Sequence, residues 1–457
     1  MNDGRPAPET PGIVRRFLVL GVLLSGLTSS SAIAASLDRD GGLSRRPQLG
    51  AAAVREPDGI TLSVVAAGRA AEKAGLRVGD RIVRIGERRI TTIADFAPAV
   101  RLQPVGKAIP FSVVRSGAPV LVKVVMPEAP REHGDGFVTL YGAITVEGVL
   151  HRSLFTLPSP EMPGKKPATV LILGGIGCYS VDVATEPDDA YRELAQDLAH
   201  SGIASLRVEK SGLGDSQGNP CFSTDFRTES AQYEAAVRAL LRERRIDRSR
   251  IFLLGHSIGG LIAPELAARY PVAGVIVAEA VGRDWFEYEL LNLRRQLVLA
   301  GDAPSQIDAK LASKERCMHR LLIAREDEAL IESAEPDCRV RNAYPVGAPY
   351  MQQVAALNVA GLWSALPSMP VLAIYGTADF VADENDLRRI VDIVNSRHRG
   401  TAELKVLSGM EHRLDIAGSV EQAYEARVVE AMPLPYDHEF STSVATWIQA
   451  TASHTGG

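Results

Sequence analysis

A buried-strand pattern that runs straight into a glycine-framed serine constrains this chain most. Residues 251–254 are a continuous apolar run, Gly-His-Ser-Ile-Gly follows at 255–259, and an Ala/Leu-rich helical pattern covers 261–269. A strand, a tight turn and a helix in this order form a nucleophile elbow, where glycines flank a serine that stands at the tip of the turn. The sequence therefore predicts an exposed, reactive Ser257; the alternative is a glycine-rich turn whose serine only caps the helix.

Two later strand patterns end in side chains that could activate this serine. A serine hydroxyl needs a general base, and the base needs an acid that orients it. Residues 371–376 lead to Asp379, and residues 406–407 lead to His412. Because the acid and the histidine follow the serine in this order when the elbow is used, we predict Ser257, His412 and Asp379 as a catalytic triad.

Other acids and histidines remain open as alternatives. Asp383 follows Asp379 closely, and Glu279 ends the strand pattern after the elbow, so both are rivals for the acid. His398 and His438 are rivals for the base, although neither ends a strand. His256 lies inside the elbow, where we expect it to pack or to form a hydrogen bond.

Acyl transfer also needs two backbone N–H groups that stabilise the anion on the substrate oxygen. The first is expected from Ile258, directly after the serine. The second is expected from the loop Gly-Gly-Ile-Gly at 174–177, which follows an apolar strand pattern at 168–173. Ile176 is our choice, with Gly175 next. A phosphate-binding loop is disfavoured here because no Gly-Lys-Ser/Thr follows the glycines.

Strand and helix patterns alternate over the second part of the chain. This alternation predicts an α/β fold with a doubly wound, mostly parallel sheet. The alternation stops between about residues 281 and 366, where a helical, charged stretch is far too long for a loop. We predict that this stretch is a helical cap, inserted over the edge of the sheet where ligands of such folds bind and setting the shape of the pocket.

The segment Glu-Lys-Ser-Gly-Leu-Gly-Asp-Ser-Gln-Gly at 209–218 resembles the Arg-Gly-x-Gly-x-Ser-x-Gly loop of one branch of the α/β hydrolases. Together with the elbow and the order of the three catalytic candidates, residues 137–450 resemble this superfamily, closest to its esterase and dipeptidyl-peptidase-like branch. Lys210 and Ser211 replace the usual Arg-Gly, and the oxyanion loop lacks the usual histidine before its glycine. Because of these departures, the resemblance predicts the fold of this chain better than its substrate.

The resemblance implies a carboxylesterase-type serine hydrolase that cleaves a small-molecule acyl ester through an acyl-enzyme. It implies neither a metal ion nor an organic cofactor. A serine peptidase is the runner-up, and a non-catalytic peptide-binding adaptor is a third reading.

A smaller β-rich module is predicted at residues 49–128. Its run Ala-Gly-Leu-Arg-Val-Gly-Asp at 74–80, between a short helical pattern and a strand pattern, resembles the core of bacterial PDZ domains. Such domains bind extended peptides, often C-termini, by adding a strand to a sheet edge. A peptide or protein C-terminus is therefore an implied partner; the alternative is a module that only packs or orients substrate access.

The N-terminal residues 1–34 read as a cleaved signal peptide. Arg15 and Arg16 precede an apolar run of about eleven residues, which is too short to span a bilayer, and a small-residue site ends at Ala34. Residues 35–48 are predicted as a flexible linker. No later apolar run is long enough for a stable membrane anchor, and a net charge of −5 without a basic patch disfavours nucleic acid. We expect a secreted or periplasmic protein.

Four cysteines fit an oxidising compartment and allow three pairings. In the hydrolase fold that the resemblance implies, Cys178 follows the oxyanion loop and Cys221 ends the glycine-rich loop of the neighbouring strand. A bond between them would fasten the rim of the active site. Cys317 and Cys338 both fall within the cap and could join two of its helices.

Overall fold

The computed structural model describes residues 37, 40–160, 166–185 and 188–454. The predicted signal peptide lies outside these residues. Within them, no helix combines the length and the apolar character that crossing a membrane requires.

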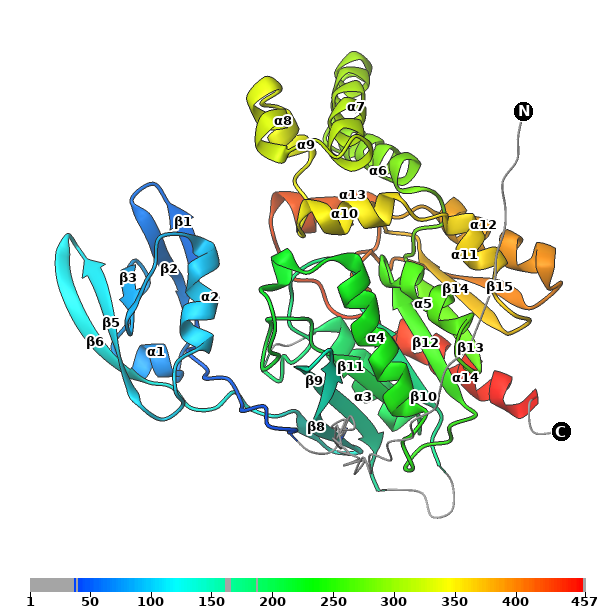
Figure 1. The fold of residues 1–457 in the computed structure, drawn as a ribbon, viewed down its shortest axis with the longest axis horizontal. Helices are drawn as coiled ribbons and strands as arrows, with labels where there is room; N and C mark the ends of the chain where they lie inside the picture. The colour runs from blue at the N-terminus through cyan, green and yellow to red at the C-terminus, as the bar shows by residue number, and fades with distance from the viewer. Residues whose placement is uncertain (1–36, 38–39, 161–165, 186–187, 455–457) are drawn as a thin grey trace, which may run out of the picture. The chain divides into compact units, whose positions relative to one another are not determined.

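A nine-stranded mixed sheet forms the centre of the larger part of the chain (Figure 1). Its strand order is β15-β14-β13-β12-β10-β11-β9-β8-β7. The strands from β10 to β15 pair in parallel, whereas β7, β8 and β9 form an antiparallel extension. The predicted α/β class with a mostly parallel sheet is confirmed. The strands are β7 His133–Gly134, β8 Phe137–Val146, β9 Val149–Pro158, β10 Thr169–Leu173, β11 Ala204–Val208, β12 Ile251–His256, β13 Gly274–Ala278, β14 Val371–Gly376 and β15 Ala402–Leu407.

Helices cover both faces of this sheet, which is why its central strands are apolar throughout. Successive side chains of a strand point to opposite faces. Leu171 and Leu173 of β10 accordingly join one core, and Val170 and Ile172 join the other. The first core contains α4 Phe226–Leu240, α5 Gly259–Ala267 and α12 Glu384–Arg397, and the second contains α3 Ala190–His200 and α14 His438–His454.

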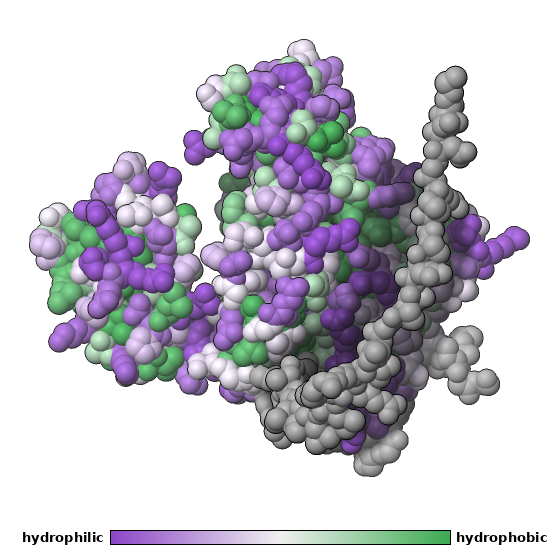
Figure 2. Space-filling view, in the orientation of Figure 1, coloured by the Kyte–Doolittle hydropathy of each residue, from purple (hydrophilic) through white to green (hydrophobic). Residues whose placement is uncertain are grey.

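Seven helical segments stand between β13 and β14, in the region predicted as a cap. They are α6 Trp285–Leu299, α7 Pro304–Met318, the π-helix η2 His319–Ile323, α8 Glu328–Ala334, α9 Cys338–Arg341, α10 Ala348–Ala355 and α11 Val359–Ser364. The disulfide Cys317–Cys338 joins α7 to α9. The surface of these helices is mainly hydrophilic, with hydrophobic positions scattered among the polar ones (Figure 2). After β15, α13 Val420–Tyr424 runs into a second π-helix, η3 Glu425–Val429.

The N-terminal β-rich module has its own antiparallel sheet and its own core. The strands are β1 Ala51–Glu56, β2 Gly59–Val65, β3 Arg81–Ile85, β4 Arg88–Arg89, β5 Ala108–Arg115 and β6 Ala118–Val125, with α1 Ala70–Lys73 and α2 Ile93–Arg101. Leu62, Ile85 and Phe111 are fully buried in this core. The Ala-Gly-Leu-Arg-Val-Gly-Asp run connects α1 to β3, as the sequence predicts.

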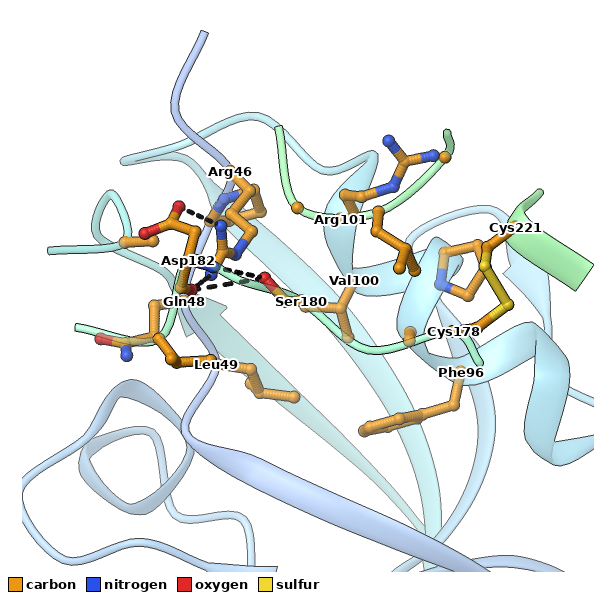
Figure 3. Close-up of a pocket in the computed structure, with 18 of the residues that line it drawn as sticks. Arg46, Gln48, Leu49, Phe96, Val100, Arg101, Cys178, Ser180, Asp182 and Cys221 are labelled. Atoms are coloured by element: carbon orange, nitrogen blue, oxygen red, sulfur yellow. Dashed lines mark hydrogen bonds and ion pairs between the residues drawn. A yellow bond between two sulfur atoms is a disulfide. The ribbon is translucent and has the colours of Figure 1, made fainter. Parts of the chain in front are cut away.

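The segment expected to be a flexible linker is anchored along its described residues. Arg45 is buried and forms ion pairs with Asp182 and Asp215, which belong to loops after β10 and β11. Arg46 binds Asp182 as well (Figure 3). Two buried carboxylates need cationic partners, and the Arg45-Arg46 pair supplies them. The polar composition of this segment therefore reflects ion pairing rather than flexibility.

Candidate active site

The strand–turn–helix around Ser257 has the geometry that the sequence predicts. β12 ends at His256, α5 begins at Gly259, and Ser257 takes the left-handed backbone conformation with φ 52°. The glycines are required by close approach. A Cβ on Gly259 would lie 2.3 Å from the carbonyl oxygen of Leu173, and a Cβ on Gly255 would lie 2.6 Å from that of Gly259.

Two loops at the ends of neighbouring strands bring Asp379 and His412 to this serine. The Nε2 atom of His412 lies 3.1 Å from Oγ of Ser257, and its Nδ1 atom lies 2.8 Å from Oδ2 of Asp379. Asp379 is fixed by its second oxygen, because Oδ1 accepts hydrogen bonds from the backbone N–H groups of Val381 and Ala382. The three side chains form one hydrogen-bonded series.

The charges of this series suit a base that takes a proton. Burial alone would lower the pKa of His412, but the Asp379 carboxylate and its hydrogen bond raise this pKa above the ordinary value of 6.5. Burial alone would raise the pKa of Asp379, but His412 holds it below its usual range. The carboxylate therefore stays ionised beside the imidazole of His412.

Two backbone N–H groups beside Ser257 are free to bind an anion. Ile258 and Ile176 donate no backbone hydrogen bond among the described residues. The loop that carries Ile176 approaches closely, since a Cβ on Gly175 would lie 3.5 Å from the Cβ of Ser257. Gly175, the second choice from sequence, is engaged elsewhere because its N–H donates to the hydroxyl of Tyr191 at 2.9 Å.

Side chains from two helices hold the loop that carries Ile176, and no sequence pattern predicted them. Gly174 N–H donates to Tyr233 of α4, and Gly175 N–H donates to Tyr191 of α3. Both tyrosines lie on the buried faces of their helices. An aromatic residue on a buried helix face is ordinary, so periodicity alone gave no sign of this role.

His256 connects the elbow to the same network. Its Nε2 donates to the carbonyl oxygen of His412 at 2.7 Å, so its Nδ1 accepts the hydroxyl proton of Tyr191 at 2.6 Å. Burial and the neighbouring His412 lower the pKa of His256 to about 3, so the ring stays neutral. The expectation of a hydrogen-bonding role within the turn agrees with this geometry.

Lys210, one of the departures from the usual loop sequence, also contacts the oxyanion loop. It is buried, pairs with Glu229 at 3.1 Å and donates to the carbonyl oxygen of Gly175 at 2.7 Å. The lysine therefore holds the carbonyl oxygen of Gly175, while the two tyrosines hold the N–H groups of Gly174 and Gly175.

A cavity of about 750 Å³ opens over Ser257 and His412. Its apolar wall comes from Ile176, Phe380, Val381, Val428, Pro433 and Leu434. Its polar lining includes Asp188 and Arg413, neither of which has an ion-pair partner among the described residues. No residue of the 281–366 region lines this cavity in the described part of the chain. The expectation that the cap sets the pocket is therefore wrong for this cavity, because its apolar wall comes from η3, from the residues after η3 and from the loops after β10 and β14.

The rival residues are engaged away from the serine. Asp383 caps α12 and pairs with Arg295. His398 binds the carbonyl oxygen of Leu366, and His438 pairs with Asp197 at an exposed site. Glu279 lies near Asp379, but the two ring nitrogens of His412 bind Asp379 and Ser257 instead.

Two groups of side chains have the proximity of metal ligands. One is Glu279, Asp379 and His412, and the other is Cys317, Glu335 and Cys338. In the first group, His412 and Asp379 already bind each other. In the second, the two sulfurs form a disulfide. Neither group offers a free ligand set.

A disulfide fastens the loop that follows the oxyanion residues. Cys178 is joined to Cys221, the first residue of the short 3₁₀ helix η1 Cys221–Ser223 (Figure 3). This bond and Cys317–Cys338 are the two pairings that the sequence analysis preferred. Asp182, which binds Arg45 and Arg46, lies four residues beyond Cys178, so the loop is held at two points.

Comparison with known protein families agrees with this geometry. Residues 184–415, half of the chain, match the family described as serine aminopeptidase, S33. The chain belongs to this family of α/β hydrolases. Residues 61–115 match the PDZ domain family, so the β-rich module is a PDZ domain.

Two curated relatives match in part. The chain is 28% identical over 251 residues to esterase EstD of Thermotoga maritima, which covers 53% of each protein. It is 35% identical over 65 residues to a probable periplasmic DegP-like serine endoprotease of a Marinomonas species, 14% of each protein. The chain thus spans about half the length of the first relative and much less of the second.

Solved structures resemble the larger part of the chain at low sequence identity. The hypothetical protein PA2218 of Pseudomonas aeruginosa is 14% identical, with 70% of this chain and 95% of that one covered and a TM-score of 0.44. Esterase PF2001 of Pyrococcus furiosus is 15% identical, with 71% and 96% covered and a TM-score of 0.43. Est1E of Butyrivibrio proteoclasticus is 15% identical, with 69% and 99% covered and a TM-score of 0.42.

Proposed function

We propose that this protein is a serine hydrolase that cleaves carboxylic esters through an acyl-enzyme. The observation that carries the proposal is the hydrogen-bonded series from Asp379 through His412 to Ser257, which opens into a cavity. The match to an esterase supports the choice of an ester.

In the first half of the reaction, Oγ of Ser257 attacks the carbonyl carbon of the ester while Nε2 of His412 takes its proton. The carbonyl oxygen becomes an anion, which the N–H groups of Ile258 and Ile176 stabilise by hydrogen bonds. Asp379 stabilises the imidazolium and holds its Nδ1–H. His412 then gives the proton to the alkoxide oxygen, the alcohol leaves, and the acyl group stays on Ser257.

Water completes the cycle by the same groups in reverse roles. His412 takes a proton from a water molecule, which attacks the acyl carbon, and the same two N–H groups stabilise the second anion. The proton returns to Oγ of Ser257 as the carboxylic acid is released. The apolar wall of the cavity suits an acyl or aryl group of the substrate.

Labelling with a fluorophosphonate probe tests the nucleophile directly. The wild-type protein should be labelled and should hydrolyse p-nitrophenyl esters, and Ser257→Ala should do neither. Ser249→Ala is the matched control, because Ser249 is an exposed serine hydrogen-bonded to Asp247. A wild-type protein that is folded but neither labelled nor active would contradict the proposal and favour a non-catalytic adaptor.

A peptidase is the second candidate. The description of the matching family favours it, and the carboxylate of Asp188 on the cavity lining, which has no ion-pair partner among the described residues, suits a free peptide amine. Comparing kcat/KM for aminoacyl anilides and for simple esters distinguishes the two. Faster turnover of the anilides that disappears in Asp188→Asn would favour the peptidase.

We further propose that residues 49–128 form a peptide-binding module and residues 137–450 the hydrolase domain. Binding of an extended C-terminal peptide along a sheet edge is the expected mode. Titration of the whole protein with peptides that end in a free carboxylate, against the same peptides as amides, tests it. Equal binding of both forms, or of neither, would contradict C-terminal recognition.

The mature chain is proposed to work in the periplasm or outside the cell. Two disulfides support this, since disulfides are rare in the cytosol of mesophiles. N-terminal sequencing of the exported protein should find a start after Ala34. Full-length protein recovered from the cytoplasm would contradict it.

A further inference from the structure

A second carboxylic acid lies behind the carboxylate that holds His412. Glu279 follows β13 directly, is fully buried and takes a left-handed backbone conformation with φ 50°. Its Oε1 accepts the backbone N–H of Gly376 at 2.6 Å. Its Oε2 meets no donor among the described residues.

The group that Glu279 faces is Asp379. Carboxyl oxygens of Glu279 and Asp379 and a ring nitrogen of His412 all lie within 4.8 Å of one another. Oε2 of Glu279 is the buried carboxyl oxygen of this group that has no other partner among the described residues, so a proton on it has Asp379 as its neighbouring acceptor. Two buried carboxylates at this range cannot both be ionised, so one of them carries a proton.

The surroundings decide which of the two is protonated. Asp379 accepts two backbone N–H groups and the Nδ1–H of His412, all of which favour its anion. Among the described residues, Glu279 accepts a single hydrogen bond, from the backbone N–H of Gly376. Burial and the negative charge of Asp379 raise the pKa of Glu279 well above its usual value.

The remaining titratable groups nearby also favour a proton on Glu279 rather than on Asp379, or stay neutral. Glu411, on the loop after β15, is paired with Arg427 and adds negative charge that disfavours an ionised Glu279. The hydroxyl groups of Tyr375 on β14 and Tyr288 on α6 have pKa values raised by burial and by Asp379, so both stay neutral.

We propose that Glu279 is a protonated positioning residue, whose carboxyl group donates a hydrogen bond to Asp379 and holds that carboxylate toward His412. The inference rests on the proposed triad. The resulting series runs Glu279, Asp379, His412, Ser257, with the negative charge on Asp379 alone. Glu279 thereby gives the buried carboxylate of Asp379 one more hydrogen-bond donor, beside the two backbone N–H groups and His412.

Infrared spectroscopy tests the protonation state without any need for activity. At about pH 9, above the usual carboxyl range, the wild type should retain the C=O band of a protonated carboxylic acid. A difference spectrum against Glu279→Gln should show the loss of this band. A wild type without the band, or a variant that keeps it, overturns the proposal, whether or not the protein proves to be a hydrolase.

Kinetics test the positioning role. Glutamine can donate its N–H to Asp379 and accept the Gly376 N–H, so Glu279→Gln should lower kcat/KM several-fold and leave the acid limb of its pH profile in place. Glu279→Leu can do neither. It should lower kcat much further and move the acid limb upward, because an Asp379 carboxylate without this one donor binds the imidazolium more strongly.

An ionised Glu279 would give a different shift of the acid limb in Glu279→Gln. If Glu279 were ionised, Glu279→Gln would remove a negative charge near His412 and move the acid limb to lower pH. That shift, or a loss of kcat in Glu279→Gln as large as in Asp379→Asn, overturns the proposal. If Glu279→Leu fails to fold, the glutamine variant and the infrared band still decide.

Discussion

The protonation state of His412 decides whether it can serve as a base for Ser257. His412 can accept a proton from Ser257 only while it is neutral. Because Asp379 raises the pKa of His412, the neutral fraction falls at a higher pH than for an ordinary histidine. The pH dependence of the reaction therefore reports the contact between these two residues.

The first prediction concerns this pH dependence. In the wild type, kcat/KM should fall with decreasing pH through a midpoint above 6.5, the ordinary value for histidine. In Asp379→Asn the imidazolium loses its partner, so the midpoint should move down while kcat drops by about 10⁴. A pH–rate profile of both proteins on one ester measures this. An unmoved midpoint in the variant would contradict the assigned contact.

The second prediction concerns Tyr191, whose hydroxyl joins the oxyanion loop to His256. Tyr191→Phe leaves the Gly175 N–H and the His256 Nδ1 unsatisfied, at a cost of about 1–3 kcal/mol for a buried group. We expect kcat to fall more than KM rises, with the thermal midpoint lowered. Tyr424→Phe is the control, because Tyr424 contacts Phe380 through its ring and its hydroxyl forms no hydrogen bond among the described residues. Equal kinetics in both variants would remove Tyr191 from the network.

The residues that the sequence predicts for the site, and that the structure brings together, are those whose position along the chain carries information. Ser257, Asp379 and His412 each follow a strand pattern, and parallel strands bring their ends to one edge. Tyr191, Tyr233 and Lys210 reach the oxyanion loop from three separate elements, and their neighbours in sequence are ordinary. From sequence, Glu279 is only a rival of Asp379 for the acid of the triad. Contact between two buried acids requires a proton between them, and no sequence pattern predicts such a proton.

Among the helices and loops, the segment from η3 to residue 434 lines the cavity where the sequence predicts the cap. Long helical insertions were predicted from length and composition, and helices do occupy residues 285–364. Which wall they form depends on packing between elements far apart in sequence. The short stretch after β15 gave no comparable signal, although it supplies Val428 and Leu434 to the cavity.

The third prediction uses two adjacent valines of η3. Val428 lines the cavity and Val429 does not, although both are about half exposed or more (48% and 60%). Val428→Trp should reduce kcat/KM for long acyl chains more than for acetyl esters, because the indole fills part of the cavity. Val429→Trp should leave the ratio of the two unchanged. A chain-length series of p-nitrophenyl esters measures both, and identical profiles would exclude this wall from acyl binding.

The fourth prediction separates the two disulfides. Cys178–Cys221 closes the longer stretch of chain, 43 residues against 21, and it fastens the loop beside the oxyanion residues. Replacing both cysteines of either pair by serine should lower stability, by about 2–4 kcal/mol for a typical disulfide. Only the Cys178–Cys221 variant should also lower kcat at temperatures where it is folded. Equal effects on kcat would show that the first bond has no special part in holding the loop.

At the scale of the whole molecule, the chain enters and leaves the PDZ domain at one place. Pro47 and Glu128 form an isolated antiparallel bridge, and hydrogen bonds on either side join Gln48 to Pro127 and Ala129 to Arg46. Residues before and after the domain therefore belong to one structural unit with the larger sheet. The PDZ domain is in this sense an insertion rather than an N-terminal appendage.

The fifth prediction follows from that arrangement. Excising residues 49–127 and joining the ends by a short glycine linker should leave a folded hydrolase, because the two ends already lie side by side and Arg45 is kept. A second variant that begins after residue 129 lacks Arg45 and Arg46, so Asp182 and Asp215 stay buried with fewer partners. Breaking a buried ion pair on one side costs about 3–5 kcal/mol, so this truncated protein should unfold at a clearly lower temperature.

Point variants of the full chain separate the ion pairs from the rest of the deleted segment. Arg45→Ala should reproduce the loss of stability, whereas Arg55→Ala, at an exposed site on β1, should not. Thermal unfolding of the four proteins measures the effect, and equal stability of the excised and truncated forms would show that the segment before the PDZ domain does not stabilise the larger sheet.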